Sequence, residues 1–207
     1  MTGLDHLVYV APDLAAAVDE LAARTGVRAT PGGRHVGHGT HNALLALGPD
    51  AYLEIIASDP AQPPPAAPRP FGLDTLTAPR LLTWALKAPD IDAHVARARA
   101  AAYDPGVVLS MNRARPDGVR LAWRLTLTPR LSGDGLVPFL IDWGTTPHPA
   151  AGAAPGCTLV DLRAEHPEPA VIRPLLTALA VDLSLCRGVA PALIATVETP
   201  RGRLQLI

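Results

Sequence analysis

Two segments of the chain, about 77 residues apart, carry the same pattern, and this repeat limits the possible folds more than any other feature. The segment LDHLVYVAPDLAAAV, from Leu4 to Val18, aligns without gaps on LLTWALKAPDIDAHV, from Leu81 to Val95. The two segments share a leucine, an Ala-Pro-Asp tripeptide and a valine. Self-similar units at a fixed spacing are typical of a tandem architecture, in which one supersecondary unit occurs more than once.

Each copy predicts a strand followed by a helix. In the first copy an apolar strand is expected over residues 4–10, with Asp5 and His6 as its polar exceptions. A helix is expected after it, because apolar residues recur at the spacing of one buried face. Pro12-Asp13 marks its start and Gly26 its end. A strand-helix start that occurs twice predicts an α+β fold built from modules.

Strands follow the helix in both copies, and a third unit comes after them. The first copy is expected to add a short strand over 27–30 and the two strands of a hairpin. The second copy has a helix through Ala102, and its strands are expected over 107–113, 119–128 and 137–143. The third unit is expected to have a strand over 159–165, a helix from about residue 172 with Pro174 in its first turn, and strands over 192–198 and 204–207.

These elements predict three modules in one compact domain. Residues 1–58 form a first βαβββ module, residues 81–146 a second, and residues 147–207 a shorter βαββ module. The segment over 59–80 contains DPAQPPPAAPRP, which proline excludes from a helix or a central strand. The segment is expected to be a connector, and its proline-rich run over 59–70 is expected to be extended over the surface.

Composition and charge exclude several classes of partner. A net charge of -1 and a pI near 6.6 give no basic field, so nucleic acid and anionic membranes are not expected as partners. No apolar run reaches membrane-spanning length, and the N-terminus lacks the basic region of a signal peptide. Cys157 and Cys186 are isolated thiols, which fits a reducing compartment. We therefore expect a cytoplasmic protein.

The segment from His35 to Ile56 contains the densest group of candidate functional residues. Glycines separate its first histidines, so His35, His38 and His41 are expected in a loop leading into a strand rather than on one helix. That strand over 41–47, a turn at Gly48-Pro49-Asp50 and a partner strand over 51–57 make a hairpin.

Glu54 is the exception in the partner strand of this hairpin. A carboxylate on a partly covered face costs several kcal/mol, on the order of a buried polar group, unless a cation or hydrogen-bond donors compensate it. Glu54 is therefore a candidate metal ligand or catalytic base. The alternative is that it faces a wet edge or accepts hydrogen bonds from loop amides.

The length of the turn decides which side chains share the face of Glu54. With a three-residue loop, Leu44 lies opposite Glu54, and Thr40 and Asn42 face the same side as polar contacts for a ligand. With a loop one residue longer, His41 takes their place. The shorter loop is preferred, and the alternative for these polar groups is that they only satisfy local backbone atoms.

Four motifs in their order resemble one family. The motifs are GLDHLVYVAPDL, HGTHN with YLEIIA, RPDGVRLAWRL and VPFLIDWGTTPHP, and they are spread over residues 3–149, most of the chain. Repeated βαβββ units with these motifs resemble the glyoxalase-like domain proteins of the vicinal oxygen chelate superfamily, which includes glyoxalases, ring-cleaving dioxygenases and antibiotic-resistance proteins. The resemblance implies that the modules pair into an open curved sheet or half-barrel around a cleft. Such modules pair either within one chain or between two chains, so the resemblance is compatible with a monomer and with a homodimer.

The resemblance also implies a metal site. Carried over position by position, its ligands are His6 and Glu54 from the first module and Asp142 from the second. The fourth position falls on Thr83, or on Trp84 with a slip of one residue, and neither is an ordinary ligand. An imidazole and two carboxylates would suit Zn, Fe, Mn or Ni, and such an ion would act as a Lewis acid on neighbouring substrate oxygens. The alternative for His6 is a neutral imidazole with satisfied ring nitrogens.

Other side chains are weaker candidates for substrate binding. His38 belongs to the polar HGTHN segment. Arg113, just before an expected turn at Pro116-Asp117-Gly118, could reach an anionic substrate, although solvated charge is the commoner role. Trp84 and Trp143 could wall the cleft and stack on a planar ligand, although core packing is the default for each.

Three functions are compatible with these residues. The first is a glyoxalase-like small-molecule enzyme, a metal-assisted isomerase, lyase or dioxygenase. The second is a non-catalytic protein that sequesters a drug or metabolite in the same cleft, as resistance proteins of the superfamily do. The third is a metal-free enzyme whose acid/base pair is His6 and Glu54.

Overall fold

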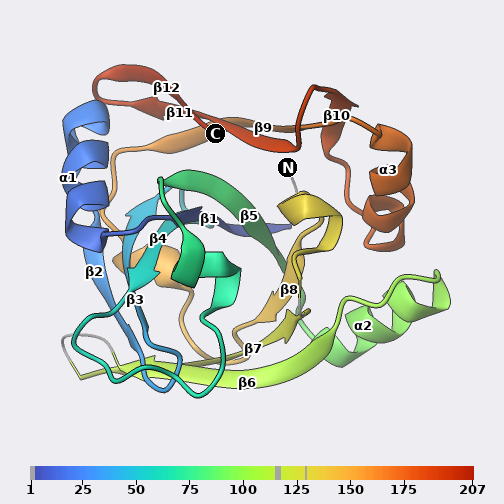
Figure 1. Cartoon of the computed structure of the whole chain (residues 1–207), viewed down its shortest axis with the longest axis horizontal. Coiled ribbons are helices and arrows are strands. Elements are labelled where there is room, and N and C mark those ends of the chain that lie inside the picture. The colour runs from blue at the N-terminus through green and yellow to red at the C-terminus, as the bar shows by residue number, and fades with distance from the viewer. Residues whose placement is uncertain (1–2, 115–117, 129) are drawn as a thin grey trace.

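The two copies of the repeat form one barrel in the computed structural model of the chain, which describes residues 3–114, 118–128 and 130–207. The first module consists of β1 (Leu4–Val10), α1 (Leu14–Thr25), β2 (Thr30–His35), β3 (Thr40–Ala46) and β4 (Tyr52–Ser58). The second consists of β5 (Arg80–Lys87), α2 (Ile91–Ala100), β6 (Val107–Ala114), β7 (Arg120–Leu127) and β8 (Phe139–Asp142). The predicted α+β class and the tandem βαβββ modules are confirmed (Figure 1).

The eight strands follow one another around the barrel in the order β1-β4-β3-β2-β6-β7-β8-β5. The two copies of the repeat meet along β1 and β5, which pair antiparallel with Leu7 opposite Trp84. On the far side, Arg34 of β2 pairs with Ala114 of β6, and this contact joins the strands of the two modules into one curved, closed sheet.

Local signals explain the ends of α1. The side chain of Asp13 accepts a hydrogen bond from the backbone N–H of Ala16 at 2.9 Å and so caps the N-terminus. Gly26 ends the helix with a φ of 80°, a left-handed conformation that glycine adopts without steric cost. Both ends are as the sequence predicts, whereas β2 begins at Thr30, later than the strand predicted over 27–30.

The hairpin has the shorter of the two turns considered. Leu44 pairs with Glu54, and the backbone N–H of Leu47 donates to the carbonyl of Ala51 at 2.9 Å. Thr40 and Asn42 therefore share the face of Glu54, because side chains alternate along a strand. His35 differs from its prediction, since it ends β2 instead of lying in the loop.

The third unit forms a separate sheet with the order β10-β9-β11-β12. Its elements are β9 (Thr158–His166), α3 (Pro169–Ala178), β10 (Ser184–Arg187), β11 (Ala192–Thr199) and β12 (Gly202–Leu206). It has one strand more than predicted, β10, and its strand order differs from that of the barrel modules. The helix begins at Pro169 and carries Pro174 in its interior, so the predicted start near residue 172 is wrong.

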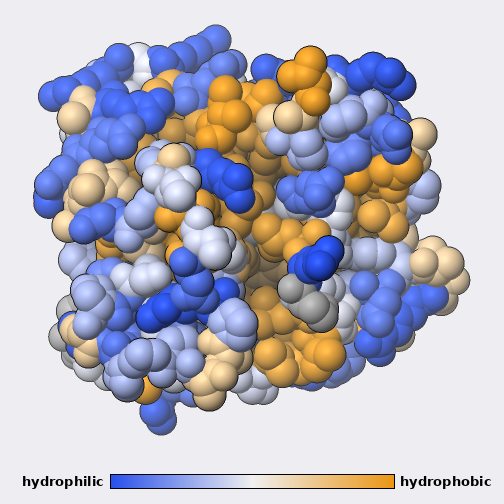
Figure 2. Space-filling model, in the orientation of Figure 1, coloured by the Kyte–Doolittle hydropathy of each residue, from blue (hydrophilic) through white to orange (hydrophobic). Residues whose placement is uncertain are grey.

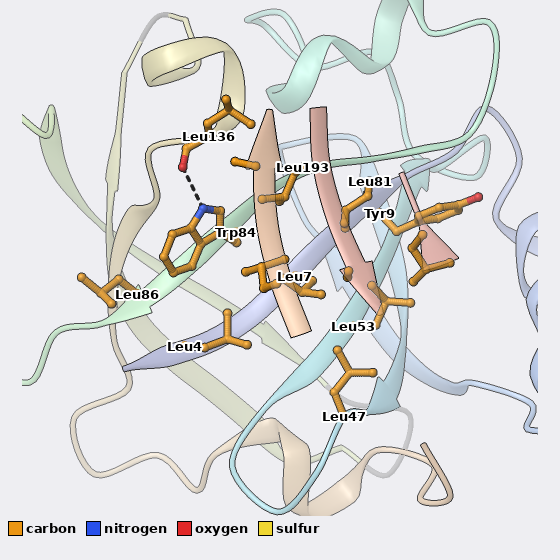
Figure 3. Packing of buried hydrophobic residues seen from close by; sticks show 14 of the residues in the cluster. Leu4, Leu7, Tyr9, Leu47, Leu53, Leu81, Trp84, Leu86, Leu136 and Leu193 are labelled. Atoms are coloured by element: carbon orange, nitrogen blue, oxygen red, sulfur yellow. Dashed lines mark hydrogen bonds between the residues drawn. The ribbon is translucent and has the colours of Figure 1, made fainter. Parts of the chain in front are cut away.

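The main core lies between the barrel and this second sheet. Leu7 and Leu53 of the barrel and Leu193 of β11 belong to one buried cluster, which Figure 3 shows from close by. Trp84 lies in the same cluster, and its indole N–H donates to the carbonyl of Leu136 at 3.0 Å. The outer face of β1 and β5 is thus covered, while their inner face is left for the interior of the barrel.

The proline-rich connector does more than cross the surface. After the proline-rich run, residues 70–75 form a short 3-10 helix, η1 (Pro70–Thr75), which the sequence did not predict. The Arg69 guanidinium donates to the carbonyl of Gly39 at 2.9 Å, and the Gln62 amide donates to the carbonyl of Thr40 at 3.1 Å. These bonds fix the connector against the start of β3.

Two further 3-10 helices, η2 (Ser132–Gly135) and η3 (Pro149–Gly152), flank β8 in the sequence. Within the described part of the chain, no helix has the length and apolar character needed to cross a membrane.

Candidate active site

A cavity of about 1280 Å³ occupies the interior of the barrel and opens on one side of the molecule. Figure 2 shows this side, where hydrophobic side chains gather around a central hollow. Strands of both modules and the connector contribute to its wall. The polar and aromatic side chains of the first module that line it are His6, His35, His38, Thr40, Asn42, Tyr52 and Glu54.

His6 is held in the cavity wall by two neighbours. It is only 3% exposed, and its ring stacks on that of Tyr52, with ring centres 4.7 Å apart. Its Nδ1 lies 2.7 Å from Oδ1 of Asp5. Because Nδ1 is engaged, Nε2 is the ring nitrogen left for chemistry.

Glu54 lies beside this nitrogen, as β4 runs next to β1 in the sheet. Its Oε2 is 3.8 Å from Nε2 of His6. Its other oxygen, Oε1, accepts a hydrogen bond of 2.5 Å from the Asn42 amide. The first module thus brings His6, Glu54 and Asn42 together, with one oxygen of the carboxylate fixed and the other facing the imidazole.

Asp5 is fully buried and accepts hydrogen bonds from three side chains. Besides His6, they are the indole N–H of Trp143, 3.1 Å from Oδ2, and Nε2 of His148, also 3.1 Å from Oδ2. Burial alone would raise the pKa of Asp5, but the hydrogen bonds from His148 and His6, together with the electrostatic attraction of these two side chains, outweigh it and hold the pKa well below its ordinary value of 3.8. The carboxylate is therefore ionised.

Burial also shifts the protonation of two other groups in the wall. It lowers the pKa of His35 to about 4, against a smaller opposite effect of the charge on Glu54. It raises the pKa of Tyr52, and the negative charges of Asp5 and Glu54 add to this effect. His35 is thus a neutral imidazole at pH 7, with Nδ1 2.9 Å from the hydroxyl of Thr40.

The remaining predicted contacts lie around this group. His38 is exposed and lies at the cavity wall, and Trp143 lines the wall while bonding Asp5. Arg113 lines it from β6, is 4% exposed and donates to the carbonyl of Gly32. Two residues of the turn expected after Arg113, at positions 116 and 117, lie outside the described residues.

Trp84 does not line the cavity, so the prediction that it walls the cleft is wrong. Its side chain is fully buried on the outer side of β5, in the cluster that packs against the second sheet. Core packing, the alternative considered for it, is what the structure shows.

Asp142 is not brought to His6 and Glu54, because the register of β8 differs from the one assumed. Val8 pairs with Glu54 between β1 and β4, and its counterpart in the repeat, Ala85, pairs with Phe139 between β5 and β8. Phe139 therefore takes the place of Glu54, and Phe139 lines the cavity. The carboxylate of Asp142 instead accepts a hydrogen bond from the backbone N–H of Gly144 at 2.9 Å.

The residues present do not fit a divalent metal. Across the described ranges, no three His, Cys, Asp or Glu side chains are grouped closely enough to hold an ion. The counterparts of His6 and Glu54 in the second module are Thr83 and Phe139, and the hydroxyl of Thr83 is not an ordinary ligand for such an ion. The predicted set of His6, Glu54 and Asp142 is therefore corrected to a pair.

Sequence reasoning missed Asp5 and His148 as parts of the site. Strand alternation would place Asp5 on the face opposite His6, but the pairing of β1 with β5 shifts register between Leu4 and His6, and such an irregularity re-aims a side chain. The one local signal was an acidic residue beside a histidine in an otherwise apolar strand. Nothing in the sequence indicated that His148 reaches Asp5.

The sequence was also compared with known protein families and proteins. The model of a family described as a glyoxalase-like domain matches residues 4–180 of the chain. No curated protein matches it.

Two solved structures resemble this chain at low sequence identity. A hypothetical protein from Staphylococcus aureus is 11% identical, with a TM-score of 0.63, over 98% of this chain and 84% of that one. The methylmalonyl-CoA epimerase from Mycobacterium tuberculosis is 23% identical, with a TM-score of 0.45, over 72% and 92% of the two chains. The first likeness supports the fold, and the second is too low to support an activity.

Proposed function

The chain belongs to the glyoxalase-like domain family, and from this premise we propose that it is a small-molecule enzyme that moves a proton on its substrate without a metal. In the proposed reaction, His6 and Glu54 remove a proton from a carbon next to a carbonyl group and return it to a neighbouring atom. This is isomerase chemistry carried out by general acid and base groups.

One observation supports the proposal most strongly, the placement of His6 and Glu54 in the cavity. The distance of 3.8 Å between Nε2 and Oε2 leaves both atoms within reach of one substrate group. Asp5 and Asn42 hold the opposite ends of the two side chains. Because Nδ1 of His6 and Oε1 of Glu54 are fixed by these hydrogen bonds, Nε2 and Oε2 are held in position for proton transfer.

The proton balance of the reaction closes within the site. The C–H bond breaks, its electron pair moves towards the carbonyl oxygen, and the proton goes to Nε2 of His6. The imidazolium that forms lies between the carboxylates of Asp5 and Glu54, which stabilise its positive charge. In a 2-hydroxy ketone, Oε2 of Glu54 takes the hydroxyl proton and passes it to the former carbonyl oxygen, while Nε2 of His6 returns its proton to the former carbonyl carbon. The ring is neutral again, the carbonyl and hydroxyl groups have exchanged places, and neither an oxidant nor a reductant is required.

The position of the pair also predicts the stereochemical course. His6 and Glu54 project from the adjacent strands β1 and β4, on one side of the cavity. Both groups therefore approach the substrate from the same side. We expect the proton to be removed and returned on one face of the substrate.

The second module supplies a different kind of surface. Leu125, Phe139 and Ile141 line the cavity with apolar side chains, which exclude water from the reacting group. Arg113 adds a positive charge that acts on Tyr52, whose ring stacks on His6. This charge favours the negative charge that develops on the substrate.

The same large apolar cavity favours one alternative, a protein that binds a drug or metabolite without changing it. A volume of about 1280 Å³ exceeds the range of roughly 300–1,000 Å³ usual for ligand sites, so sequestration of a bulky compound is physically reasonable. The buried Asp5–His6–Glu54 array is unexplained by that alternative, because binding alone needs no fixed acid/base pair.

Location and assembly complete the proposal. The free thiols of Cys157 and Cys186 support a cytoplasmic protein. The two modules already pair within one chain, so the cavity does not need a second copy, and a homodimer is not required for the proposed chemistry.

Deuterium exchange tests the proton transfer without knowledge of the full substrate. The protein is incubated in D2O with 2-hydroxy ketones, 2-oxo acids and acyl thioesters, and exchange at the carbon next to the carbonyl is followed by NMR. We expect exchange in at least one class, lowered about 100-fold in His6→Asn and in Glu54→Gln. His41→Asn, in β3 beside Asn42 but on the other face, is the matched control and retains the wild-type rate.

Several results would contradict the proposal. They are a lack of exchange with every probe, equal rates in wild type and the two variants, and loss of exchange after dialysis against EDTA. Binding of a probe without any exchange would support the sequestering protein instead.

A further inference from the structure

We infer that Asp5 is a positioning residue, which keeps a proton on Nδ1 of His6 and thereby leaves Nε2 free to accept the substrate proton. The inference deepens the proposed function and rests on it, because it assigns the tautomer of the proposed base. It concerns a side chain that touches His6 and not the substrate cavity.

The contact between Asp5 and His6 sets the tautomer. An ionised carboxylate can only accept hydrogen bonds, so the ring nitrogen 2.7 Å from Oδ1 must carry the proton. The depressed pKa of Asp5 supports the ionised form. The neutral imidazole has one N–H, and with the proton on Nδ1 the other nitrogen has a free lone pair.

The other partners of Asp5 keep its charge in place. A fully buried carboxylate is costly unless donors surround it, and here Trp143 and His148 donate to Oδ2. The indole of Trp143 is a donor only. Nδ1 of His148 accepts the backbone N–H of Ala150 at 3.3 Å, so its Nε2 carries the proton that points to Asp5.

These directions assign Asp5 a static role. Because Nε2 of His148 already carries a proton, it cannot take one from Asp5. The site therefore has no proton relay from His6 through Asp5 to His148. Asp5 is a fixed anion that orients His6 and stabilises the imidazolium. Two of its three donors follow β8 in the chain, so the second half of the barrel also determines how the proposed base of the first half is oriented.

The tautomer can be read directly from the protein without substrate. Nitrogen-15 NMR of the histidine rings distinguishes protonated from unprotonated Nδ1, with His6 assigned by its loss in His6→Asn. We expect wild-type His6 to carry its proton on Nδ1. An Nε2-protonated ring in the wild type would overturn the inference, whether or not any Asp5 variant folds.

The variant Asp5→Asn tests the role. Its amide N–H can donate to Nδ1 and favour the Nε2-protonated tautomer, which cannot accept a proton there. We expect the His6 signals to change tautomer and the deuterium exchange rate to fall at least 100-fold. Asp142→Asn is the matched control, since it makes the same chemical change at a carboxylate outside the cavity, and it should alter neither readout.

The two readouts separate this inference from the proposed function. Exchange that depends on His6 and Glu54 but persists in a folded Asp5→Asn variant would overturn the role of Asp5 alone. The expected tautomer together with a lack of exchange for every probe would overturn the proposed function, while the placement of the proton by Asp5 would stand.

Discussion

At the scale of single residues, hydrogen bonds decide which atoms of the site are left for chemistry. Nδ1 of His6 and Oε1 of Glu54 are each engaged by a side chain behind them, Asp5 and Asn42. What remains is one ring nitrogen and one carboxylate oxygen that face each other. The reactive atoms are thus the ones that the hydrogen bonds to Asp5 and Asn42 leave unused.

His35 provides a prediction about pH. Its folded-state pKa of about 4 lies below the ordinary 6.5, so between these pH values the unfolded chain binds a proton that the folded chain does not. Its contribution to stability is complete above pH 6.5 and is lost as the pH falls towards 4, on the order of 3 kcal/mol. We expect His35→Gln to flatten the fall of the unfolding free energy across this window, as measured by urea denaturation.

The same substitution at the exposed His38 is the control for loss of an imidazole. If His35→Gln and wild type lose stability equally between pH 6.5 and 4, the burial of a neutral His35 is not the cause of the pH dependence.

Part of the site was accessible from the sequence. Strand alternation and the short turn predicted that Asn42 shares the face of Glu54, and the structure pairs them. Asp5 and His148 were not accessible, because a register shift turns one side chain and the other arrives from far along the chain. Long-range contacts of this kind leave no local pattern.

At the scale of elements, the connector is part of the cavity and not a passive linker. Its residues from Ala67 to Gly72 line the wall, and Arg69 ties it to the carbonyl of Gly39. Phe71 packs with Phe139 across the two segments, with ring centres 6.2 Å apart. The connector therefore limits the space available to a ligand.

Gly39 is where this arrangement can be tested. Its φ is 64°, and an added Cβ would lie 2.9 Å from Cδ of Pro65 and 3.1 Å from Nε of Arg69. Gly39→Ala should lower the unfolding free energy by about 1–2 kcal/mol for the left-handed backbone, with about 1 kcal/mol more for the contacts. Chemical denaturation of Gly39→Ala measures the sum of these two losses.

Gly37 offers a matched control. Its φ is 81°, and an added Cβ would meet nothing within 4 Å, so Gly37→Ala carries only the backbone cost. Equal losses in the two variants would show that the connector is not packed tightly against Gly39.

The elements differ in how well their sequence specifies them. The helices have caps and a regular apolar face, so α1 ends where expected. The strand β8 has four residues, and its run of apolar side chains does not fix which ones face inward, which is why Asp142 was assigned to the wrong position. The proline content of residues 59–70 excludes a helix interior or a central strand there, but it does not predict the 3-10 helix η1 that follows.

At the scale of the whole molecule, the barrel and the second sheet share a core. Leu193 of β11 is 2% exposed and belongs to the same cluster as Leu7 and Trp84 (Figure 3). The repeat predicted the tandem modules but not how the third unit packs on them, since its own strand order differs.

Leu193→Ala tests whether the third unit and the barrel unfold together. The substitution should cost about 2–5 kcal/mol, as for a large side chain removed from a core. All three tryptophans lie in or next to barrel strands, so their fluorescence reports on the barrel. We expect the urea midpoint seen by fluorescence to fall, although the substitution is in the other sheet.

Val189→Ala, at a fully exposed position of the same unit, should leave that midpoint unchanged. A fluorescence midpoint that does not move in Leu193→Ala, while circular dichroism detects an earlier transition, would indicate two independently folding parts.

The barrel divides its tasks between its two halves. The groups proposed to handle the proton come from the first copy of the repeat, whereas the apolar surface facing them comes largely from β7 and β8 of the second. Substitutions in the second copy can therefore change which molecules are accepted while the reactive pair is kept. A duplicated unit can in this way acquire a new substrate selectivity in one half, because the other half keeps the reactive side chains.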